Sequence, residues 1–189
     1  GVTGVQTCAL PISPQVLKTE VCAQSRLFTV ESIDLRFSNG VEAQWERLKG
    51  SSRGAVLIVP MLDEDTVLLI REYAAGVERY ELALPKGKID PGESTLDAAN
   101  REMMEEVGYG AKRLTHLDSV TIAPGYLSHT THIVLGEELY EQRLEGDEPE
   151  EVEVIPWKLS ELSSLLAHPE MTEARSIAAL FMVRERQQQ

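Results

Sequence analysis

The feature that most constrains this chain is a 23-residue stretch with fixed spacing of glycines and charges, GKIDPGESTLDAANREMMEEVGY, from Gly87 to Tyr109. Its second half places Glu102, Glu105 and Glu106 at helical positions i, i+3 and i+4, which share one face. Like charges so spaced destabilise an isolated helix, and acids near its C-terminus also oppose the helix dipole. Taken alone, such a cluster most often forms a solvated acidic surface, whereas a bound cation would reverse both unfavourable effects.

The residues around these glutamates predict a tight loop followed by a helix. Gly92 favours a sharp bend, Ser94 or Thr95 can cap the helix, and Gly108 supplies its C-terminal stop. Spacings of three and four residues predict the apolar stripe of this helix: Leu96, Ala99, Met103 and Val107.

The rest of the chain predicts an α/β fold with a mixed sheet packed between helices. Alternation on both sides of Asn39-Gly40 predicts a β-hairpin over residues 26–48, and the apolar runs 53–62 and 67–74 predict a second hairpin. Further strands are expected at 80–85, 114–123, 131–139 and 152–157, and helices at 158–167 and 172–186. Strands, a helix, more strands and terminal helices are typical of this class of fold.

The charge balance restricts the partners. The chain has 31 acids against 18 bases, a net charge of -13, which argues against nucleic acid or an anionic membrane surface as the main partner. A phosphate-bearing substrate therefore needs a bridging cation or a local basic cluster. The apolar runs are too short to span a bilayer, so we expect a soluble protein.

The N-terminal residues and the cysteines carry little functional signal. Cys8 and Cys22 cannot build a multi-bridge framework, which fits a reducing cytoplasm, and no export signal is evident. Residues 1–13 contain QTCALPI, which resembles the translation of a common sequencing-library adapter. We therefore expect residues 1–13 to be a non-native artefact segment.

The 23-residue stretch matches the signature of the Nudix hydrolases at every fixed position, with Tyr109 standing where the pattern prefers an aliphatic residue. This resemblance implies a Nudix α/β/α sandwich. In the family, Glu93 and Arg101 resemble the pair that ties the loop to the helix, so both are assigned structural support together with Gly87.

The resemblance also implies a divalent metal and pyrophosphate hydrolysis. Mg²⁺ prefers octahedral oxygen ligands, with Mn²⁺ as an alternative. The implied ligands are Glu102, Glu105 and Glu106 and the main chain at Lys86, and Glu105 is also a candidate catalytic residue. Metal ions at such a site polarise phosphoryl oxygens and activate water.

Several further segments, among them LIREYAAGVERYEL and LEGDEPE, resemble the ADP-ribose and ADP-sugar branch, in particular bacterial hydrolases of ADP compounds. The resemblance implies ADP-ribose, short diadenosine polyphosphates and NADH as substrates, cleaved to AMP. It also implies an N-terminal β-hairpin arm at 14–50, a Nudix hydrolase domain at 51–186, and a homodimer that exchanges the arm. Strict ADP-ribose enzymes enter the signature through PAG, whereas LPKG here favours broader selectivity.

The same resemblance suggests residues outside the signature. Glu148 is the first candidate for the catalytic base and Glu150 the second, although both also fit a solvated acidic loop. Glu46 resembles a position that contacts substrate across a dimer interface. Arg71 can pair with a phosphate and Glu81 can reach the adenosine end, and for each an ordinary strand or salt-bridge role is equally compatible.

Two alternatives to the leading function stay open at this point. The same chemistry could act on longer diadenosine polyphosphates or nucleotide sugars. A non-catalytic Nudix-fold nucleotide-binding module belongs to a different class, and the complete set of acids in the signature argues against it.

Overall fold

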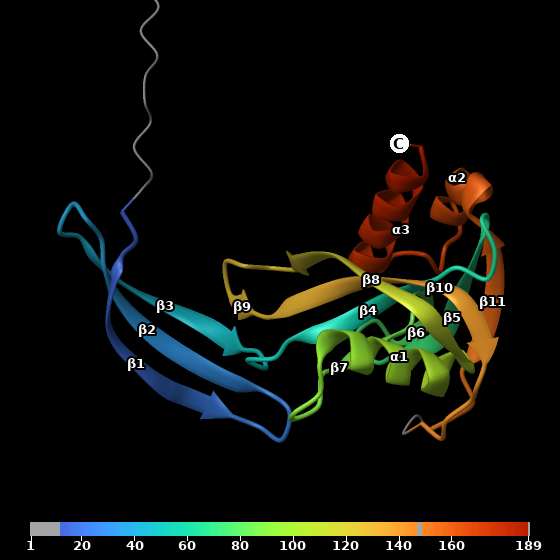
Figure 1. The fold of residues 1–189 in the computed structure, drawn as a ribbon. Helices are drawn as coiled ribbons and strands as arrows, with labels where there is room; N and C mark the ends of the chain where they lie inside the picture. The colour runs from blue at the N-terminus through green and yellow to red at the C-terminus, as the bar shows by residue number, and fades with distance from the viewer. Residues whose placement is uncertain (1–11, 147–148, 189) are drawn as a thin grey trace, which may run out of the picture. The chain divides into compact units, whose positions relative to one another are not determined.

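The computed structural model describes residues 12–146 and 149–188 (Figure 1), so most of the expected artefact segment lies outside the described residues. The chain divides into two compact units. The first comprises Gly1–Gly50 with Ala123–Ser128, and the second comprises Ser51–Ile122 with His129–Gln189. Each unit is described by itself.

The first unit is one sheet with strand order β1-β2-β3-β9. Its strands are β1 (Gln15–Gln24), β2 (Thr29–Arg36), β3 (Glu42–Lys49) and β9 (Leu127–Ser128). The hairpin predicted at Asn39-Gly40 is confirmed: β2 and β3 pair antiparallel, and Gly40 takes a φ of 83° in the turn. The arm is larger than a hairpin, because β1 adds along β2. All ten residues of β1 are exposed, so this strand has no buried face. Its sequence accordingly lacks the alternation of apolar and polar residues that marks a half-buried strand.

The second unit holds two sheets, with strand orders β7-β4-β10-β8 and β11-β5-β6. Its strands are β4 (Ala55–Pro60), β5 (Thr66–Ala74), β6 (Arg79–Ala83), β7 (Lys86–Lys88), β8 (Tyr109–Thr121), β10 (Thr130–Glu141) and β11 (Glu153–Lys158). Its helices are α1 (Thr95–Glu106), the 3₁₀ turn η1 (Leu159–Glu161), α2 (Leu162–Leu166) and α3 (Ala174–Gln187). Strand β4 runs parallel to β10 and antiparallel to β7, which confirms the mixed sheet. Within the part of the chain described here, no helix has the length and apolar character needed to cross a bilayer.

The second predicted hairpin is wrong. Strands β4 and β5 are joined in the described structure by the isolated bridge Met61↔Val67, and otherwise belong to different sheets. Strand β4 pairs with β7 and β10, whereas β5 pairs with β6 and β11. Both runs are apolar on both faces, as central strands are, and such a pattern does not specify the neighbouring strand.

Alternate side chains of β4 enter two cores on opposite faces of the sheets. Leu57 and Val59 pack in the core that includes residues of α2 and α3, and Val56 and Ile58 pack in the core that includes α1. Figure 1 shows α1 on one side of the strands, with α2 and α3 on the other. The α/β/α sandwich predicted from the sequence is therefore confirmed.

Helix α1 begins and ends where the sequence predicts. The Ser94 hydroxyl accepts the Asp97 N–H at 3.1 Å as the N-cap, and Gly108 follows the helix with a φ of 81°. Ala99, Met103 and Val107 are buried as predicted, but Leu96 is 37% exposed. Burial begins only at Ala98, because the first turn of α1 does not pack on the strands.

Candidate active site

The three glutamates of α1 line two adjoining cavities. The larger, about 500 Å³, has the loop and strand around β7 as its other wall, including Lys86 and Gly87. The smaller, about 270 Å³, is closed by the segment that follows β10. Glu102, Glu105 and Glu106 line both. The structure thus brings together the acids that the sequence assigned to a metal.

Gly87 lets a carboxylate lie directly against the backbone. A Cβ built at Gly87 would be 1.9 Å from Glu102 Cδ and 2.1 Å from each of its carboxylate oxygens. Gly87 is held there because it pairs with Val56 of β4. Any larger residue would displace the Glu102 carboxylate from this position.

Arg101 uses all five of its N–H donors, three toward the loop and two toward acids of its own helix. Its Nε and Nη2 donate to the two oxygens of Glu93 at 2.9 and 3.0 Å, and Nη2 also donates to the Lys88 carbonyl at 2.9 Å. Its Nη1 donates to Glu102 Oε1 at 2.8 Å and Glu105 Oε2 at 3.1 Å. These bonds hold the pKa of Glu93 below its ordinary value and raise that of Arg101. The guanidinium therefore fixes two of the acidic side chains.

Glu106 is the buried member of the acidic group. It is 5% exposed, and its Oε2 accepts the Lys86 N–H at 2.9 Å. Burial raises the pKa of Glu106 to about 8 because it disfavours the charged form. The charge and the N–H of Lys86 oppose this rise, and repulsion from Glu72 and Glu102 adds to it. The Lys86 ammonium pairs with Glu72 of β5. Glu72 was not predicted from the sequence, where its only distinguishing feature is that it is an acidic residue near the end of an apolar strand.

These residues fit a divalent cation. Among the described residues no group of three or more His, Cys, Asp or Glu side chains converges closely enough to hold a metal, and Arg101 engages both Glu102 and Glu105. The donor set nevertheless consists of the hard carboxylate oxygens that Mg²⁺ prefers. One carboxylate lies in the space that Gly87 leaves open, and Glu106 is buried with its charged form disfavoured.

Two of the residues predicted outside the signature lie beside this group. Glu150 lines the smaller cavity, and its oxygens accept the Tyr80 hydroxyl at 2.9 and 3.2 Å, which raises the pKa of Tyr80. Glu148 lies outside the described residues. Arg71 forms ion pairs of 2.9 Å with both Glu153 and Glu170, and it shares a further cavity with Tyr80 and Glu150.

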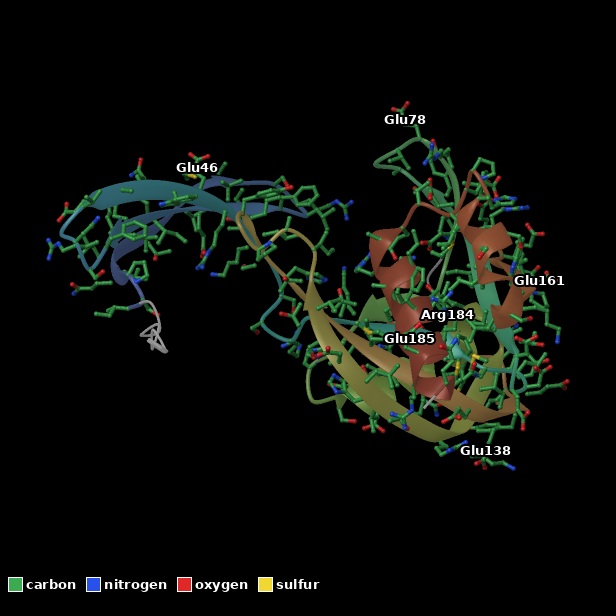
Figure 2. The ribbon with its side chains drawn as sticks, turned by 90° about the horizontal axis from the view of Figure 1, so that it is seen from above. Glu46, Glu78, Glu138, Glu161, Arg184 and Glu185 are labelled. Atoms are coloured by element: carbon green, nitrogen blue, oxygen red, sulfur yellow. The ribbon has the colours of Figure 1, made fainter. Side chains whose placement is uncertain are left out.

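The other two predicted residues lie elsewhere. Glu81 is buried and accepts bonds from the Thr172 hydroxyl at 2.7 Å and Arg79 Nε at 2.5 Å, so its carboxylate ties β6 to the segment before α3. Burial opposes its ionisation, but these bonds outweigh burial and lower the pKa of Glu81. Glu46 belongs to the first unit, where it is exposed and points outward from β3 (Figure 2).

A second residue that sequence reasoning missed is Arg143, which lines the smaller cavity with the three glutamates. Arg143 is the only Lys or Arg between Arg113 and Lys158. A single basic residue within an acidic stretch is the feature by which the sequence could have pointed to Arg143.

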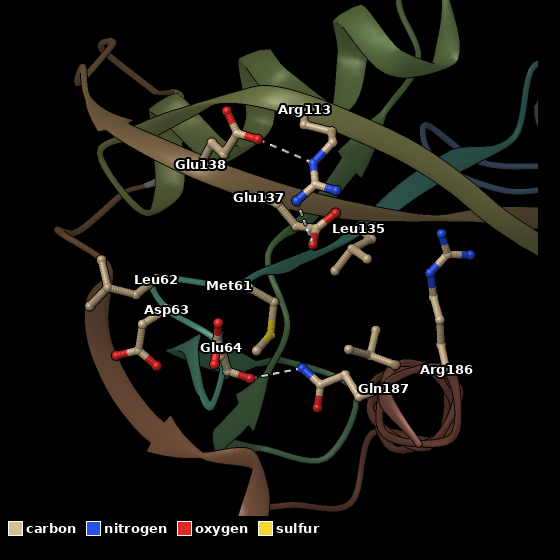
Figure 3. Close-up of a pocket in the computed structure, with 11 residues that line it drawn as sticks. Met61, Leu62, Asp63, Glu64, Arg113, Leu135, Glu137, Glu138, Arg186 and Gln187 are labelled. Carbon is tan, nitrogen blue, oxygen red and sulfur yellow. Dashed lines mark hydrogen bonds and ion pairs between the residues drawn. The ribbon is translucent and has the colours of Figure 1, made fainter. Parts of the chain in front are cut away.

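A cavity of about 580 Å³, larger than either of these two, lies elsewhere in the second unit (Figure 3). It lies between the β4–β5 loop, β8, β10 and α3, and none of the signature residues lines it. Its Arg113 is already paired with Glu137 at 3.0 Å and Glu138 at 3.4 Å. A choice of functional site by cavity volume alone would therefore favour a cavity that lacks Glu102, Glu105 and Glu106.

Comparison with known proteins agrees with this geometry. Residues 51–181 match the family model of the NUDIX domain, and residues 14–47 match the NudE-type Nudix hydrolase N-terminal domain. The chain is 53% identical over 172 residues to ADP compounds hydrolase NudE of Escherichia coli K12, covering 91% of this chain and 92% of that protein. It is 31% identical over 171 residues to an ADP-ribose pyrophosphatase of Bacillus subtilis, covering 87% and 91%.

A solved structure is also similar. The crystal structure of an ADP compounds hydrolase has 50% sequence identity and a TM-score of 0.88, covering 94% of this chain and 96% of that one. The signature lies within residues 51–181, which match the family model. The chain therefore belongs to the Nudix hydrolase family.

Proposed function

We propose that this hydrolase cleaves the pyrophosphate linkage of ADP-linked compounds, namely ADP-ribose, diadenosine di- and triphosphate and NADH, and releases AMP. The observation that carries the proposal is the gathering of Glu102, Glu105 and Glu106 around two adjoining cavities, against the open backbone of Gly87. The names of the two relatives, an ADP compounds hydrolase and an ADP-ribose pyrophosphatase, support this class of substrate.

The proposed cofactor is Mg²⁺, with Mn²⁺ as an alternative. Glu102, Glu105 and Glu106 would hold it, together with the main chain at Lys86. When bound, the cation neutralises phosphoryl charge and makes the attacking water more acidic. The chain contributes orientation, because Arg101 fixes Glu102 and Glu105 and the Lys86 N–H fixes Glu106.

The base is proposed to be a carboxylate that takes the proton of the attacking water as the P–O bond of the anhydride breaks. Glu148 is the first candidate, Glu150 the second, and Glu105 the candidate on the helix itself. Glu150 lines the smaller cavity and is oriented by the Tyr80 hydroxyl. Single changes to glutamine assign the role, since the base variant loses kcat with little change in KM.

Three residues are proposed to contact substrate. Arg71 shares a cavity with Glu150, from which a guanidinium can reach a phosphate. Glu46 and Glu81 are proposed to contact the substrate, with Glu81 at the adenosine end. Because Glu81 already has internal partners, its change to alanine should lower stability as well as raise KM.

We also propose a homodimer formed through the first unit. All ten residues of β1 are exposed, and large apolar side chains are more than half exposed in this unit, including Val16, Val21, Phe28 and Trp45. A second copy of the chain would cover such a surface. Sedimentation equilibrium tests this proposal, and a monomer at micromolar concentration would contradict it.

The deciding experiment is a substrate panel with and without Mg²⁺. ADP-ribose, diadenosine di-, tri- and pentaphosphate, NADH and GDP-mannose are incubated with the protein, and AMP and the second product are quantified. We expect Mg²⁺-dependent AMP release from ADP-ribose, diadenosine di- and triphosphate and NADH. Activity confined to the pentaphosphate or to GDP-mannose would move the function to the alternative substrates, and no AMP from any adenosine compound would overturn it.

A glycine pair tests the role of the acidic group without removing any charge. Gly87→Ala should displace the Glu102 carboxylate and lower kcat by about 100-fold, the order expected for a misplaced catalytic group. Gly76→Ala is the matched control, because a Cβ there has no described atom within 4 Å. Equal activity of the two variants would contradict the assignment of Glu102.

A further inference from the structure

The C-terminal end of α1 carries more negative charge than the helix itself neutralises. Glu102, Glu105 and Glu106 lie in its last turns, and its last turn contains no basic residue. The free carbonyls at a helix C-terminus add the negative end of the helix dipole. A positive group from another part of the chain is therefore needed to hold this end in place.

Arg143, which follows β10, meets that need through direct contacts. Its Nη1 donates to the Glu105 carbonyl at 3.3 Å. Its guanidinium also packs on Gly108, where a Cβ would be 3.0 Å from Nη2, 3.1 Å from Nε and 3.2 Å from Cζ. Gly108 has a φ of 81°, so glycine serves both the turn and the close approach of the arginine.

The backbone around Arg143 is fastened to the same helix end. The Gln142 N–H donates to the Gly108 carbonyl at 3.0 Å, and the Leu144 N–H donates to the Met104 carbonyl at 3.1 Å. Farther along, a Cβ at Gly146 would be 3.5 Å from Glu105 Cβ. Residues 142–146 thus run along the end of α1 and form a wall of the smaller cavity.

We propose that Arg143 is a positioning residue for the metal-holding end of α1. Its guanidinium holds the last turn, and with it Glu105 and Glu106, against residues 142–146. Arg101 and Arg143 contact this end of α1 in different ways, because Arg101 donates to the carboxylates of Glu102 and Glu105 and Arg143 donates to the Glu105 carbonyl. The inference rests on the proposed function in one respect, namely that the acidic group binds a divalent cation.

The test measures Mn²⁺ affinity by electron paramagnetic resonance, and kcat and KM with ADP-ribose, for Arg143→Met and Arg143→Lys. Arg143→Met should weaken Mn²⁺ binding about fivefold and lower kcat at least about tenfold, with KM nearly unchanged. Arg143→Lys retains the charge and a donor and should recover part of both losses. The matched control is Arg113→Met, another arginine of the same unit with two carboxylate partners, which should change neither quantity.

The sign of the change in affinity separates positioning from simple charge screening. If Arg143 only screened the acids, its loss would strengthen their attraction for Mn²⁺. Unchanged or tighter Mn²⁺ binding by Arg143→Met therefore overturns the proposal.

A second variant reaches the same contact from Gly108, should Arg143→Met fold poorly. Gly108→Ala presses on the guanidinium and should also weaken Mn²⁺ binding. Gly40→Ala is its control, because Gly40 has a similar φ of 83° but a Cβ there has no described atom within 4 Å. In the double variant Arg143→Met/Gly108→Ala the effects should not add. Equal Mn²⁺ affinities of the two alanine variants would overturn the proposal.

Failure of this inference can be told apart from failure of the proposed function. Mn²⁺ affinity does not depend on a substrate. A wild-type protein that binds Mn²⁺ but releases no AMP overturns the proposed function alone, and its Mn²⁺ affinity still decides the role of Arg143. A wild-type protein that binds no Mn²⁺ overturns both.

Discussion

Helices α1 and α3 begin alike and end differently. Each has a side-chain N-cap, Ser94 in α1 and Glu173 in α3. Helix α3 then ends with Arg184 and Arg186 in its last turn, as the helix dipole favours, whereas α1 ends in acids with no base. The difference teaches that the end of α3 carries stabilising charges in its own sequence, while the end of α1 is held by contacts from other segments.

The largest expected effect comes from Glu106→Gln in α1. The amide keeps an acceptor for the Lys86 N–H, so the fold should persist, but it cannot ionise to bind a cation. The rate of ADP-ribose hydrolysis should fall by about three orders of magnitude or more, as expected when a metal-ligand charge is lost. Steady-state kinetics and thermal melts with and without Mg²⁺ check this, and the rise in Tm caused by Mg²⁺ should shrink. Near-normal turnover would show that Glu106 does not hold the metal.

For α3 we expect the reverse, namely a change that lowers stability and leaves activity unchanged. Glu173 accepts bonds from the Arg175 and Ser176 N–H groups and from the buried Ser176 hydroxyl. Glu173→Ala removes this cap and should lower the free energy of unfolding by about 2–3 kcal/mol. Urea unfolding measures the loss, and kcat of the folded fraction should stay at the wild-type value. A large fall in kcat without loss of stability would contradict the comparison between the two helices.

A pH series sharpens the same contrast. Burial opposes ionisation of Glu173, but bonds from Arg175 and Ser176 outweigh it and hold its pKa below the ordinary 4.5. A carboxyl group whose pKa is lower in the folded than in the unfolded state contributes to the free energy of unfolding. This contribution is present above pH 4.5 and is lost as the pH falls through the folded-state pKa. The difference in unfolding free energy between wild type and Glu173→Gln should therefore be constant from pH 6 to 8 and narrow in acid. A difference that widens in acid would show the wrong sign.

The smallest effect is expected at Leu96, which the sequence pattern placed in the buried stripe of α1. Because Leu96 is 37% exposed, Leu96→Gln should change the free energy of unfolding by less than about 0.5 kcal/mol. Met103→Ala in the same stripe should cost about 2–5 kcal/mol, since Met103 is fully buried. Similar losses for the two variants in urea unfolding would mean that α1 packs through its first turn.

The parts of the site that are close in sequence could be predicted from spacing, and the parts brought by distant segments could not, apart from Glu150, which was predicted through the family resemblance. The spacing of Gly87, Glu93, Arg101 and the helical acids identified the signature because a loop followed by a helix fixes their relative positions. Glu72 and Arg143 reach the same place from β5 and from the end of β10. Their positions depend on which strands lie side by side, and this information is absent from local spacing.

The same limit explains two of the differences between the predicted and the observed fold, at β1 and at the expected hairpin of β4 with β5. Residues on both sides of Asn39-Gly40 alternate, and a short turn sets their pairing, so the hairpin of the first unit was predictable. Strand β1 shows no alternation, because it has no buried face within its own unit. Strands β4 and β5 follow each other in sequence, but each is apolar on both faces and found its partners among later strands.

The pairing of β4 with β10 and of β5 with β11 has a consequence for the order of folding. Strands β10 and β11 are synthesised only after the whole signature, so a chain that stops after α1 leaves β4 with β7 alone and β5 with β6 alone as paired neighbours. Pairing between strands that are far apart in sequence requires long loops to close. The entropy cost of closure comes before any stabilising contact forms, and this slows folding. Helix α1 therefore packs late, and folding of the second unit should be a single cooperative event in which its two sheets form together.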